Sequence, residues 1–588
     1  MQRLAGMPQR KDYDMLLFKS RLSAELKKVL DNINDAHGLD EEKIAQMLEY
    51  PPNAEMGDIA LPCFKMSKSL RMSPVMISEK ISQELEKLEI CDIEKIETVN
   101  GYLNIYIKKD YFAKNVLGNV LEKGEKYGSF DFGKGKTVVL DYSSPNTSKP
   151  FHIGHLGTTV IGHSLKKLHE FAGYNCIGIN HLGDWGTQNG KQIVAFKRWG
   201  NKEEVEKKGC DGLVELYVKF HEEAEKDPSL NDEARAEFKK MEQHDPENIA
   251  LWKWFLDISL KEYKVTYDQL GITFDYYMGE SFFSDKMDDQ IQIMRDKGLL
   301  KLDDGASIVD LSEYNMPPCL ILKSDGASLY PSRDISAAVY RKQNFDFSKC
   351  IYVTSAGQSL HFAQWFKVME LMGYDWTDEL VHIPYGTVSI GGEKLATRTG
   401  NVVLLKHLFA QAIEKVKAIM DDKNPNLENR DEKATAVGVG AIVFHYLSNN
   451  RIKDINFVLE DALCFEGNTG PYAQYTYART CSVLDKAVGI DRSAAGSYEI
   501  NDKEKALLRT ISLFPEKVLQ ALNEYEPSVI TRYILDVCTA FNSFYHDCQI
   551  LGADDESAKA FRLNLTEATR HVLGNAFTLI CMKKTEKI

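Results

Sequence analysis

The spacing of apolar residues changes along the chain, and the first part combines two periods. Apolar residues recur at helical spacing over 13–31 and 73–88, and they alternate strictly with polar ones over 102–107. A period near 3.6 predicts helices with one buried face, whereas a period of two predicts a strand. Residues 1–115 are therefore predicted to form a small α/β module.

The middle of the chain, residues 116–410, alternates short apolar runs with longer amphipathic segments. The clearest pair is a strand-like run over 137–142 followed by a helix-like run over 154–171. This alternation predicts a doubly wound, Rossmann-like parallel sheet covered by helices. Residues 198–257 are charged and helical, which predicts an inserted helical subdomain with a solvated face.

The last part, residues 411–588, is dominated by helical periodicity, as over 434–449, 503–525 and 528–546. This pattern predicts an all-α helical bundle. With 588 residues the chain is too long for one hydrophobic core. The predicted fold class is therefore multidomain α/β, with the parallel-sheet domain between the two other units.

The amino-acid composition excludes few classes of protein. Hydrophobic residues make up 44% and charged residues 27%, as in ordinary globular proteins. The formal net charge of −14, taken alone, argues mildly against a nucleic-acid partner, because such proteins usually carry a basic footprint. Net charge averages over the whole surface, however, and an acidic protein can hold a basic groove.

The eleven cysteines are scattered, and no Cys-x-x-Cys pair occurs. No zinc site or other protein metal site is therefore predicted, and the thiols are expected to be reduced. The sequence shows no signal peptide and no long uncharged apolar run, so we expect a cytoplasmic protein without a membrane segment.

Residues 144–155, Ser-Pro-Asn-Thr-Ser-Lys-Pro-Phe-His-Ile-Gly-His, carry most of the chemical information. They join the predicted strand over 137–142 to the predicted helix over 154–171, the geometry that holds phosphate. The His-x-x-His spacing puts His152 and His155 on one side of the first helical turn. Both imidazoles are then expected to face one anion, beside free N–H groups and the positive end of the helix dipole.

This segment contains the HIGH signature of class I aminoacyl-tRNA synthetases, and its extended form resembles the arginyl-tRNA synthetases. The resemblance covers essentially the whole chain and implies ATP-dependent attachment of L-arginine to tRNA(Arg) through an arginyl-adenylate, releasing AMP and pyrophosphate. It also implies a monomer and a first step that needs bound tRNA. Five further blocks agree in order: residues 180–188, 276–281, 330–334, 358–362 and 465–475.

A second class I signature, Lys-Met-Ser-Lys-Ser, occurs literally at residues 65–69. In this class the signature loop follows the last strands of the nucleotide domain, whereas here the string precedes His152 in another module. We interpret it as a basic helix face. The resemblance places the equivalent loop at 391–403, where Thr397 replaces the second lysine and Lys149 is expected to supply the missing charge.

The implied chemistry needs no protein nucleophile, because positioning and stabilisation of phosphoryl charge lower the barrier. His152, Gly154 and His155 are expected at the phosphates of ATP. Lys149, Lys394 and Arg398 would neutralise charge on the α-phosphate or pyrophosphate. Mg²⁺ would arrive as part of the ATP complex, held mostly by phosphate and water.

A selective arginine pocket needs carboxylates placed for the guanidinium fork. The matching blocks place Glu280 and Asp334 there, with Tyr330 completing the pocket and Asn146 and Gln358 holding the α-amino and carboxylate end. Such a pocket rejects analogues that leave its acceptors unpaired by roughly 10⁴-fold or more.

Nucleotide and tRNA contacts follow from the resemblance. We expect the ribose and adenine of ATP near His181, Gly183 and Asp184. The N-terminal module is expected on the tRNA elbow and the helical domain on the anticodon. Expected RNA contacts are Asn100, Tyr102 and Asn104, interpreted as alternating on one strand, and Tyr472, Gln474 and Tyr475 on a helix.

Three alternatives remain open at this point. A class I enzyme for another amino acid is disfavoured because the Glu280 and Asp334 pair suits a cationic side chain. A small-molecule adenylyltransferase would usually be shorter and lack the helical RNA domain. A non-catalytic paralogue that only binds RNA is favoured by Thr397 alone and opposed by the intact remainder of the site.

Overall fold

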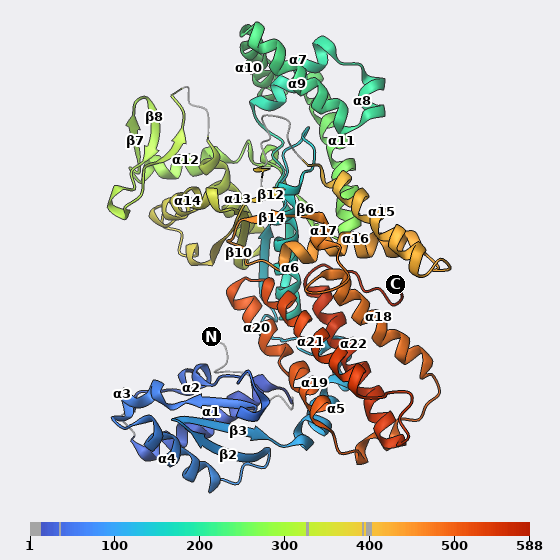
Figure 1. Ribbon diagram of the computed structural model, residues 1–588. Coiled ribbons are helices and arrows are strands. Elements are labelled where there is room, and N and C mark those ends of the chain that lie inside the picture. Colours follow the sequence, from blue (N-terminus) through green and yellow to red (C-terminus); the bar gives the residue numbers. More distant parts are fainter. Residues whose placement is uncertain (1–12, 35–36, 325–328, 391–392, 395–402) are drawn as a thin grey trace.

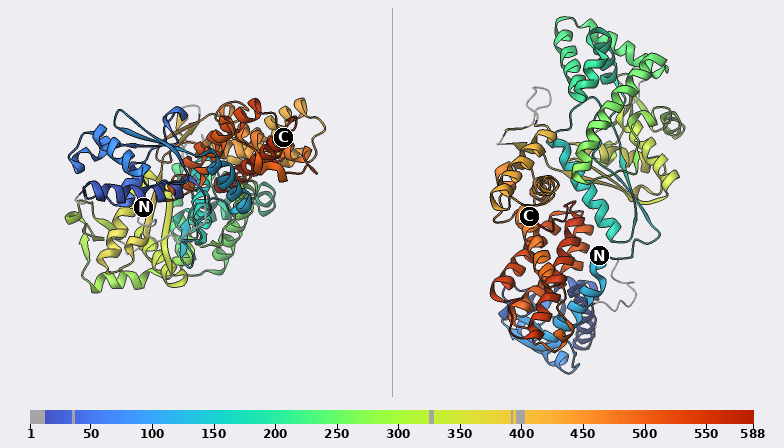
Figure 2. Two further views of the ribbon diagram at one scale, coloured as in Figure 1. Left: turned by 90° about the horizontal axis from the view of Figure 1, so that it is seen from below. Right: turned by 90° about the vertical axis from the view of Figure 1, so that its right-hand side faces the viewer.

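The computed structural model describes residues 13–34, 37–324, 329–390, 393–394 and 403–588. The N-terminal module lies at the opposite end of the molecule from helices α7–α10, with the parallel sheet between them and the C-terminal bundle beside the module (Figure 1; Figure 2). Within the described residues, no helix is long and apolar enough to cross a membrane.

The N-terminal module packs helices against an antiparallel sheet of order β1-β3-β2. Asp14 caps the first helix by accepting from the Leu17 amide, and Ser73 caps α4, which begins with Pro74. The elements are α1 (Met15–Ile33), α2 (Glu41–Met47), β1 (Ile59–Pro62), α3 (Ser67–Leu70), α4 (Pro74–Glu86), β2 (Ile93–Val99) and β3 (Tyr102–Ile107). The Lys-Met-Ser-Lys-Ser string at residues 65–69 runs into α3, and its first lysine, Lys65, pairs with Glu49 at 2.5 Å.

The central domain is built on a parallel sheet of order β11-β10-β4-β5-β6. The predicted strand and helix that flank the His-x-Gly-His turn are confirmed as β4 and α6. Helix α5 (Leu117–Lys123) leads into this domain. Its main elements are β4 (Thr137–Asp141), α6 (Ile153–Phe171), β5 (Asn175–Asn180), β6 (Tyr276–Tyr277), α13 (Tyr330–Phe345), β10 (Phe347–Ser355), α14 (Ser359–Leu371) and β11 (Leu380–Tyr385).

An antiparallel meander, which the apolar pattern does not single out, stands beside this sheet at the edge of the molecule (Figure 1). Its strands share a buried core with α12, α13 and α14. The elements are α12 (Met287–Asp296), β7 (Leu300–Asp303), β8 (Ala306–Val309) and β9 (Cys319–Leu322).

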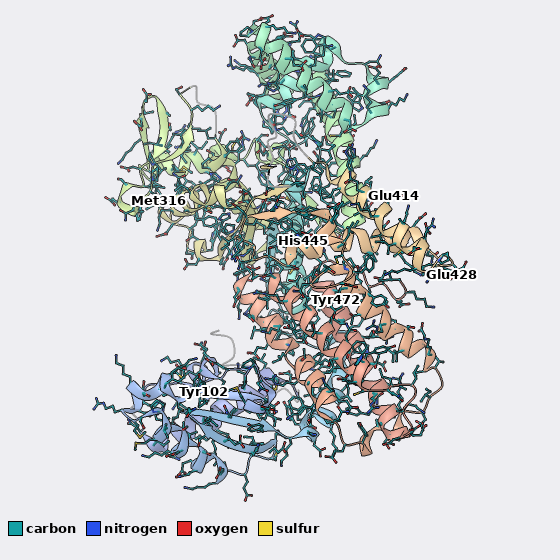
Figure 3. All side chains as sticks on the ribbon, viewed as in Figure 1. Tyr102, Met316, Glu414, Glu428, His445 and Tyr472 are labelled. Atoms are coloured by element: carbon teal, nitrogen blue, oxygen red, sulfur yellow. The ribbon has the colours of Figure 1, made fainter. Side chains whose placement is uncertain are left out.

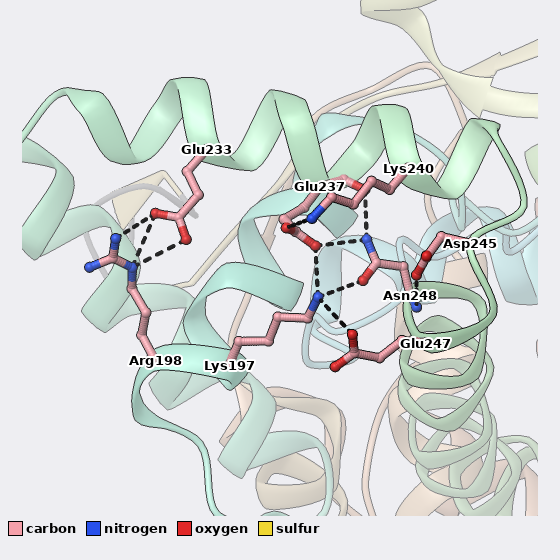
Figure 4. Close-up of polar contacts among 8 residues, drawn as sticks. All are labelled: Lys197, Arg198, Glu233, Glu237, Lys240, Asp245, Glu247 and Asn248. Carbon is pink, nitrogen blue, oxygen red and sulfur yellow. Dashed lines mark hydrogen bonds and ion pairs between the residues drawn. The ribbon is translucent and has the colours of Figure 1, made fainter.

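The inserted helical layer has a hydrophobic core of its own and extends beyond the predicted limits of 198–257. It contains α7 (Thr187–Trp199), α8 (Lys202–Lys208), α9 (Cys210–Lys226), α10 (Ser229–Glu242) and α11 (Pro246–Leu270). Glu237 joins three of these helices, since its carboxylate accepts from Lys197, Lys240 and Asn248 at 2.8, 2.6 and 2.8 Å (Figure 4). Burial alone would raise the pKa of Glu237, but these donors outweigh it and lower the pKa to about 2.

The C-terminal part is a helical bundle, as predicted. The pattern over 503–525 forms two helices because Pro515, in the first turn of the second, has no N–H to continue the first. The helices are α15 (Leu405–Lys423), α16 (Arg430–Leu447), α17 (Leu459–Ala462), α18 (Gly470–Lys486), α19 (Asp502–Ser512), α20 (Phe514–Glu524), α21 (Ser528–Asp547) and α22 (Glu556–Leu579). The boundary predicted at 410 falls inside α15. A small sheet joins β12 (Val388–Ile390) and β13 (Glu393–Lys394), which precede α15, to β14 (Ile455–Phe457), which lies between α16 and α17.

Candidate active site

The candidate site lies at the carboxyl edge of the parallel sheet. Because the strands are parallel, the segments that follow β4, β5, β6 and β10 all leave from this edge. These segments carry the residues predicted for the site, including the histidine pair after β4, His181 after β5, Glu280 after β6 and Gln358 after β10. The topology therefore brings together groups that are far apart in sequence.

The turn between β4 and α6 has an unusual backbone. Ser143, Ser144 and Ser148 have φ angles of 73°, 47° and 58°, in the left-handed region that residues other than glycine seldom occupy. Hydrogen bonds hold each of them: the Ser143 amide donates to Thr158 at 3.0 Å and the Ser148 amide to Ser259 at 2.9 Å. The Ser144 hydroxyl donates to Asp141 at 3.0 Å. These hydrogen bonds hold the turn in a strained conformation, as is common at functional sites.

Asp141, the last residue of β4, forms a buried ion pair with Arg341 of α13 at 2.7 Å. The Arg341 side chain is 1% exposed and its Cζ lies 5.4 Å from the ring centroid of Tyr352 in β10. Arg341 therefore connects the helix that begins with Tyr330, the strand before the histidine turn and the strand before Gln358. Sequence reasoning assigned no role to either partner of this pair.

The two histidines lie side by side at the start of α6, as predicted, with ring centroids 3.9 Å apart. Nδ1 of His152 accepts from the Gly154 amide at 3.0 Å, and Nδ1 of His155 accepts from the His152 amide at 3.2 Å. A neutral imidazole that accepts at Nδ1 carries its proton at Nε2. Both rings therefore present an Nε2–H donor.

The pKa values of both histidines are lowered. Burial, followed by the charge of Lys149, lowers the pKa of His152 to about 4. Burial lowers the pKa of His155 well below its usual range, with smaller effects from His152 and Lys149. At neutral pH the pair consists of two uncharged hydrogen-bond donors.

The backbone at the start of α6 differs from the prediction. The Ile153 amide donates to the Val403 carbonyl at 3.1 Å, and the Leu405 amide donates to the Phe151 carbonyl at 3.0 Å. With the His152–Leu404 bridge, these bonds pair the two segments antiparallel. The expectation of free N–H groups here was wrong, because the Val403 carbonyl, at the end of the signature loop, takes the Ile153 amide, and His152 takes the amides of Gly154 and His155. An anion would meet the imidazoles and the helix dipole instead.

Lys149 lies in the same turn, where the Tyr263 hydroxyl donates to its carbonyl at 2.7 Å and burial lowers the pKa of its ammonium. Of the signature loop, Lys394 ends the short strand β13, which pairs with β12. Arg398 and Thr397 lie outside the described residues. The described ends of the loop, β13 and Val403, are joined to β12 and to the histidine turn respectively.

The loop after β5 packs closely on the histidine turn. Gly183 and Asn146 form a parallel bridge, and a Cβ at Gly183 would lie 2.0 Å from Oδ1 of Asn146. The close approach explains why glycine is needed here. The Asn146 side chain is exposed, and Nδ1 of His181 is buried without a hydrogen-bond partner among the described residues.

Asp184 has a partner inside the protein. Its carboxylate accepts from the amide and hydroxyl of Ser281 at 2.9 and 2.6 Å, and so fixes the turn that carries Glu280. Burial raises the pKa of Asp184, while the Ser281 hydrogen bonds act in the opposite direction. The predicted contact between Asp184 and the nucleotide stays a prediction; its observed contact positions the neighbouring pocket.

The two predicted pocket carboxylates each face a cationic or ionisable group of the protein. Nη1 of Arg333 donates to Oε2 of Glu280, and Nε2 of His361 lies 2.6 Å from Oδ2 of Asp334. The pKa of Glu280 is raised to about 7 by the sum of three effects: burial raises it most, Arg333 lowers it, and the neighbouring carboxylates, Asp334 first, raise it. Sequence reasoning quoted Arg333 and His361 within matching blocks but gave them no role.

The remaining pocket residues are open to solvent. Tyr330, the first residue of α13, is 61% exposed, and Gln358 is exposed immediately before α14. Their positions at two helix starts, one turn from Asp334 and His361 respectively, place them beside the carboxylate pair. The structure thus brings together the carboxylates, Tyr330 and Gln358 at one end of α13 and α14.

The expected RNA contacts in the N-terminal module need correction. Asn100 is not on the strand: with Gly101 it forms the two-residue turn between β2 and β3, both at positive φ as in a type I′ hairpin. Asn104 is 5% exposed and faces the module's interior, which leaves little surface for a base. Tyr102 is exposed (Figure 3), and its ring centroid lies 5.5 Å from that of Phe64.

The three residues of α18 that were expected to contact RNA differ in their exposure. Gln474 is fully buried and donates to the carbonyls of Ala436 and Lys583 at 3.2 and 3.1 Å, so its expected contact with RNA is corrected to a packing role. Tyr472 is partly buried and accepts from Asn542 at 2.9 Å (Figure 3). Tyr475 is exposed, and Cζ of Arg479 lies 5.0 Å from its ring centroid.

Comparison with known proteins agrees with this geometry. Three family models match in chain order: the arginyl tRNA synthetase N-terminal domain over residues 18–107, the catalytic domain of class I (R) tRNA synthetases over 116–459, and the DALR anticodon binding domain over 473–588. The parallel sheet, the histidine turn and the catalytic-domain match together define a class I aminoacyl-tRNA synthetase.

Curated relatives narrow this class. The arginine–tRNA ligase of Alkaliphilus metalliredigens is 50% identical over 552 residues, covering 94% of this chain and 97% of the relative. That of Halothermothrix orenii is 47% identical over 576 residues, covering 98% and 100%. The chain belongs to the arginyl-tRNA synthetase family.

Solved structures show the same fold. The arginyl-tRNA synthetase of Thermus thermophilus is similar with a TM-score of 0.81 at 23% identity, covering 97% of this chain and all of that one. The enzyme of Plasmodium falciparum gives 0.79 at 23% identity, covering 97% and 99%. Among the described residues, no group of three or more His, Cys, Asp or Glu side chains is arranged to hold a metal ion.

Proposed function

We propose that this protein attaches L-arginine to tRNA(Arg) in two steps that consume ATP. In the first, a carboxylate oxygen of arginine attacks the α-phosphorus, and the bond to pyrophosphate breaks. In the second, the 2′-hydroxyl of the terminal adenosine attacks the acyl carbon, and AMP leaves. The observation that carries the proposal is the joint position of the histidine pair and the Glu280–Asp334 pocket at one edge of the sheet.

The histidine pair supports phosphoryl chemistry through its protonation state. His152 and His155 are neutral at pH 7 and present Nε2–H donors, so they stabilise charge that develops on phosphate oxygens by hydrogen bonding. Lys149, three residues before His152, adds a positive charge to the same turn. Lys394 and Arg398 would serve the pyrophosphate. Mg²⁺ enters as part of the ATP complex.

The pocket supports arginine as the substrate. Glu280 and Asp334 supply carboxylate acceptors that suit a permanently charged guanidinium, and Tyr330 stands exposed at its entrance. Asn146 and Gln358, on the adjoining segments, would hold the α-amino and carboxylate groups so that the latter faces the α-phosphate. His181, Gly183 and Asp184 would lie near the ribose and adenine.

We further propose that the N-terminal module and the bundle hold tRNA, with Tyr102, Tyr472 and Tyr475 offering rings to bases. We also propose domain limits near 115 and 410, a monomer, and a cytoplasmic location. These proposals rest on the family's organisation and on the exposed rings of Tyr102 and Tyr475.

The test is arginine-dependent exchange of pyrophosphate into ATP by the purified protein, with and without tRNA, together with charging by labelled arginine. Exchange and charging that require tRNA would support arginine activation coupled to tRNA binding. Exchange without tRNA would keep the enzyme and remove the coupling. Binding of tRNA without any exchange would overturn the proposal in favour of a non-catalytic RNA-binding protein.

A further inference from the structure

Only one of the two oxygens of the Glu280 carboxylate accepts a hydrogen bond from a described residue. Nη1 of Arg333 donates to Oε2, while Oε1 takes no hydrogen bond from any described residue. The Glu280 and Arg333 side chains are 16% and 14% exposed, so the pair is largely shielded from water. An ion pair in such surroundings keeps its geometry better than one on an open surface.

Three charged groups on two elements act on Glu280. Arg333 and Asp334 approach from α13, and Asp184 approaches from the loop after β5. His361 of α14 contacts Asp334, the charge of His181 lowers the pKa of Asp184, and neither histidine forms an ion pair with Glu280. Arg333 is therefore the one described cation that contacts a carboxylate otherwise surrounded by like charge.

The position of Arg333 fits this role. It stands in the first turn of α13 between Tyr330 and Asp334, with its Cζ 5.6 Å from the Tyr330 ring centroid. Successive helical residues point about 100° apart, so Arg333 turns toward Glu280 while Asp334 turns toward His361. The same short segment supplies the ring and a carboxylate of the pocket as well as the cation that steadies the other carboxylate.

We propose that Arg333 is a positioning residue for arginine recognition: its guanidinium favours the ionised form of Glu280 and fixes one carboxylate oxygen, so that the other oxygen is ready for the guanidinium of the substrate. This inference rests on the proposed function, because it assumes that Glu280 receives the substrate. Without Arg333, burial and the neighbouring carboxylates would leave Glu280 protonated at neutral pH, and a protonated carboxyl attracts a guanidinium weakly.

The experiment compares Arg333→Gln with wild type by measuring arginine KM, ATP KM and kcat from pH 6 to pH 9. A rise of one unit in the pKa of Glu280, from about 7, raises the arginine KM at pH 7 by about fivefold, with a difference of less than about twofold at pH 9, where Glu280 ionises in both proteins. ATP KM should stay within about twofold. Arg333→Lys, which keeps the charge, should restore most of the affinity at pH 7.

Citrulline sharpens the test, because it has the shape of arginine with a neutral ureido group. Arg333→Gln should reduce the preference for arginine over citrulline at pH 7 and recover it at pH 9. Arg295→Gln, at an exposed arginine of neighbouring α12, is the matched control and should behave as wild type. Arg333→Met, which preserves the bulk of the stem, replaces the glutamine variant if that variant does not fold.

The variant Glu280→Gln distinguishes a failure of the proposed pocket from a failure of the proposed role of Arg333. If Glu280→Gln leaves the arginine KM unchanged, the proposed pocket is wrong and the inference falls with it. If Glu280→Gln raises the KM while Arg333→Gln and Arg333→Met do not, the pocket stands and the role of Arg333 is overturned. A KM raised equally at pH 7 and pH 9 would also overturn it, because that result indicates lost packing.

Discussion

Two buried carboxylates of this protein are paired with cations and behave in opposite ways. Glu237, in the inserted helical layer, accepts from two lysines and an asparagine, and its pKa is lowered to about 2. Glu280, in the candidate pocket, has one cationic partner and two neighbouring carboxylates, and its pKa is raised to about 7. The first is satisfied within the protein; the second has capacity left for a ligand.

The largest effect should come from Glu280→Gln. Its amide offers a neutral oxygen and an N–H₂ group that opposes the substrate guanidinium, so kcat/KM for arginine should fall by about 10³-fold, or about 4 kcal/mol. The melting temperature should fall only modestly, because Arg333 loses its carboxylate partner but the amide oxygen of the new side chain can still accept from it. Steady-state charging and thermal unfolding measure both; an unchanged kcat/KM would exclude Glu280 from recognition.

The second-largest effect is expected from His155→Ala, which tests a hydrogen-bond donor of the site instead of a carboxylate. Loss of one preorganised Nε2–H donor should lower kcat for adenylate formation by about 10²-fold, or about 2.7 kcal/mol, with a smaller change in ATP KM. Pyrophosphate exchange measures this, with exposed His546→Ala as the control. Turnover equal to that of wild type would mean that His155 only caps α6 and does not stabilise the phosphate in adenylate formation.

Glu237→Gln should show the reverse pattern. It removes the buried carboxylate that Lys197 and Lys240 share, so the free energy of unfolding should fall by about 1–3 kcal/mol while kcat/KM for arginine stays within about twofold. Because the folded pKa of Glu237 is depressed, its contribution is complete above about pH 4.5 and is lost as the pH falls toward 2. Denaturant titration between pH 7 and pH 3 checks this; equal stability of the two proteins at pH 7 would remove the contrast with Glu280.

The smallest effect is the pH dependence of arginine binding in the unmodified protein. Glu280 must be ionised to attract the guanidinium, and its pKa is about 7. The arginine KM should therefore fall by about tenfold between pH 6 and pH 8, whereas the ATP KM should not follow it. A flat arginine profile would show that Glu280 is ionised throughout this range.

Local patterns were enough to predict much of the fold. The strand β4, the helix α6 and the strand β3 follow from periodicity within one short segment, and the histidine pair follows from helical spacing. The errors concern contacts between segments distant in sequence. The carbonyl of Val403 closes the start of α6, and the burial of Gln474 depends on Ala436 and Lys583.

The pocket shows the same limit. The matching blocks pointed to Glu280 and Asp334, but the partners that set their electrostatics, Arg333 and His361, were recognisable only after α13 and α14 had been placed against the loop after β6. Asn100 is a different error: an Asn-Gly pair between two alternating segments is a local hairpin signal that the strand interpretation passed over.

The closure of α6 by Val403 also has a consequence for synthesis of the protein on the ribosome. Ile153 emerges long before its partner, and at roughly 5–20 residues per second the intervening chain of about 250 residues takes roughly 10–50 s to be made. During that interval β4 and α6 can form, yet the amide of Ile153 has no carbonyl to meet. A nascent chain that ends before residue 403 therefore carries the histidine signature without the segment that pairs with it, and the start of α6 is closed only when the residues leading into α15 are added.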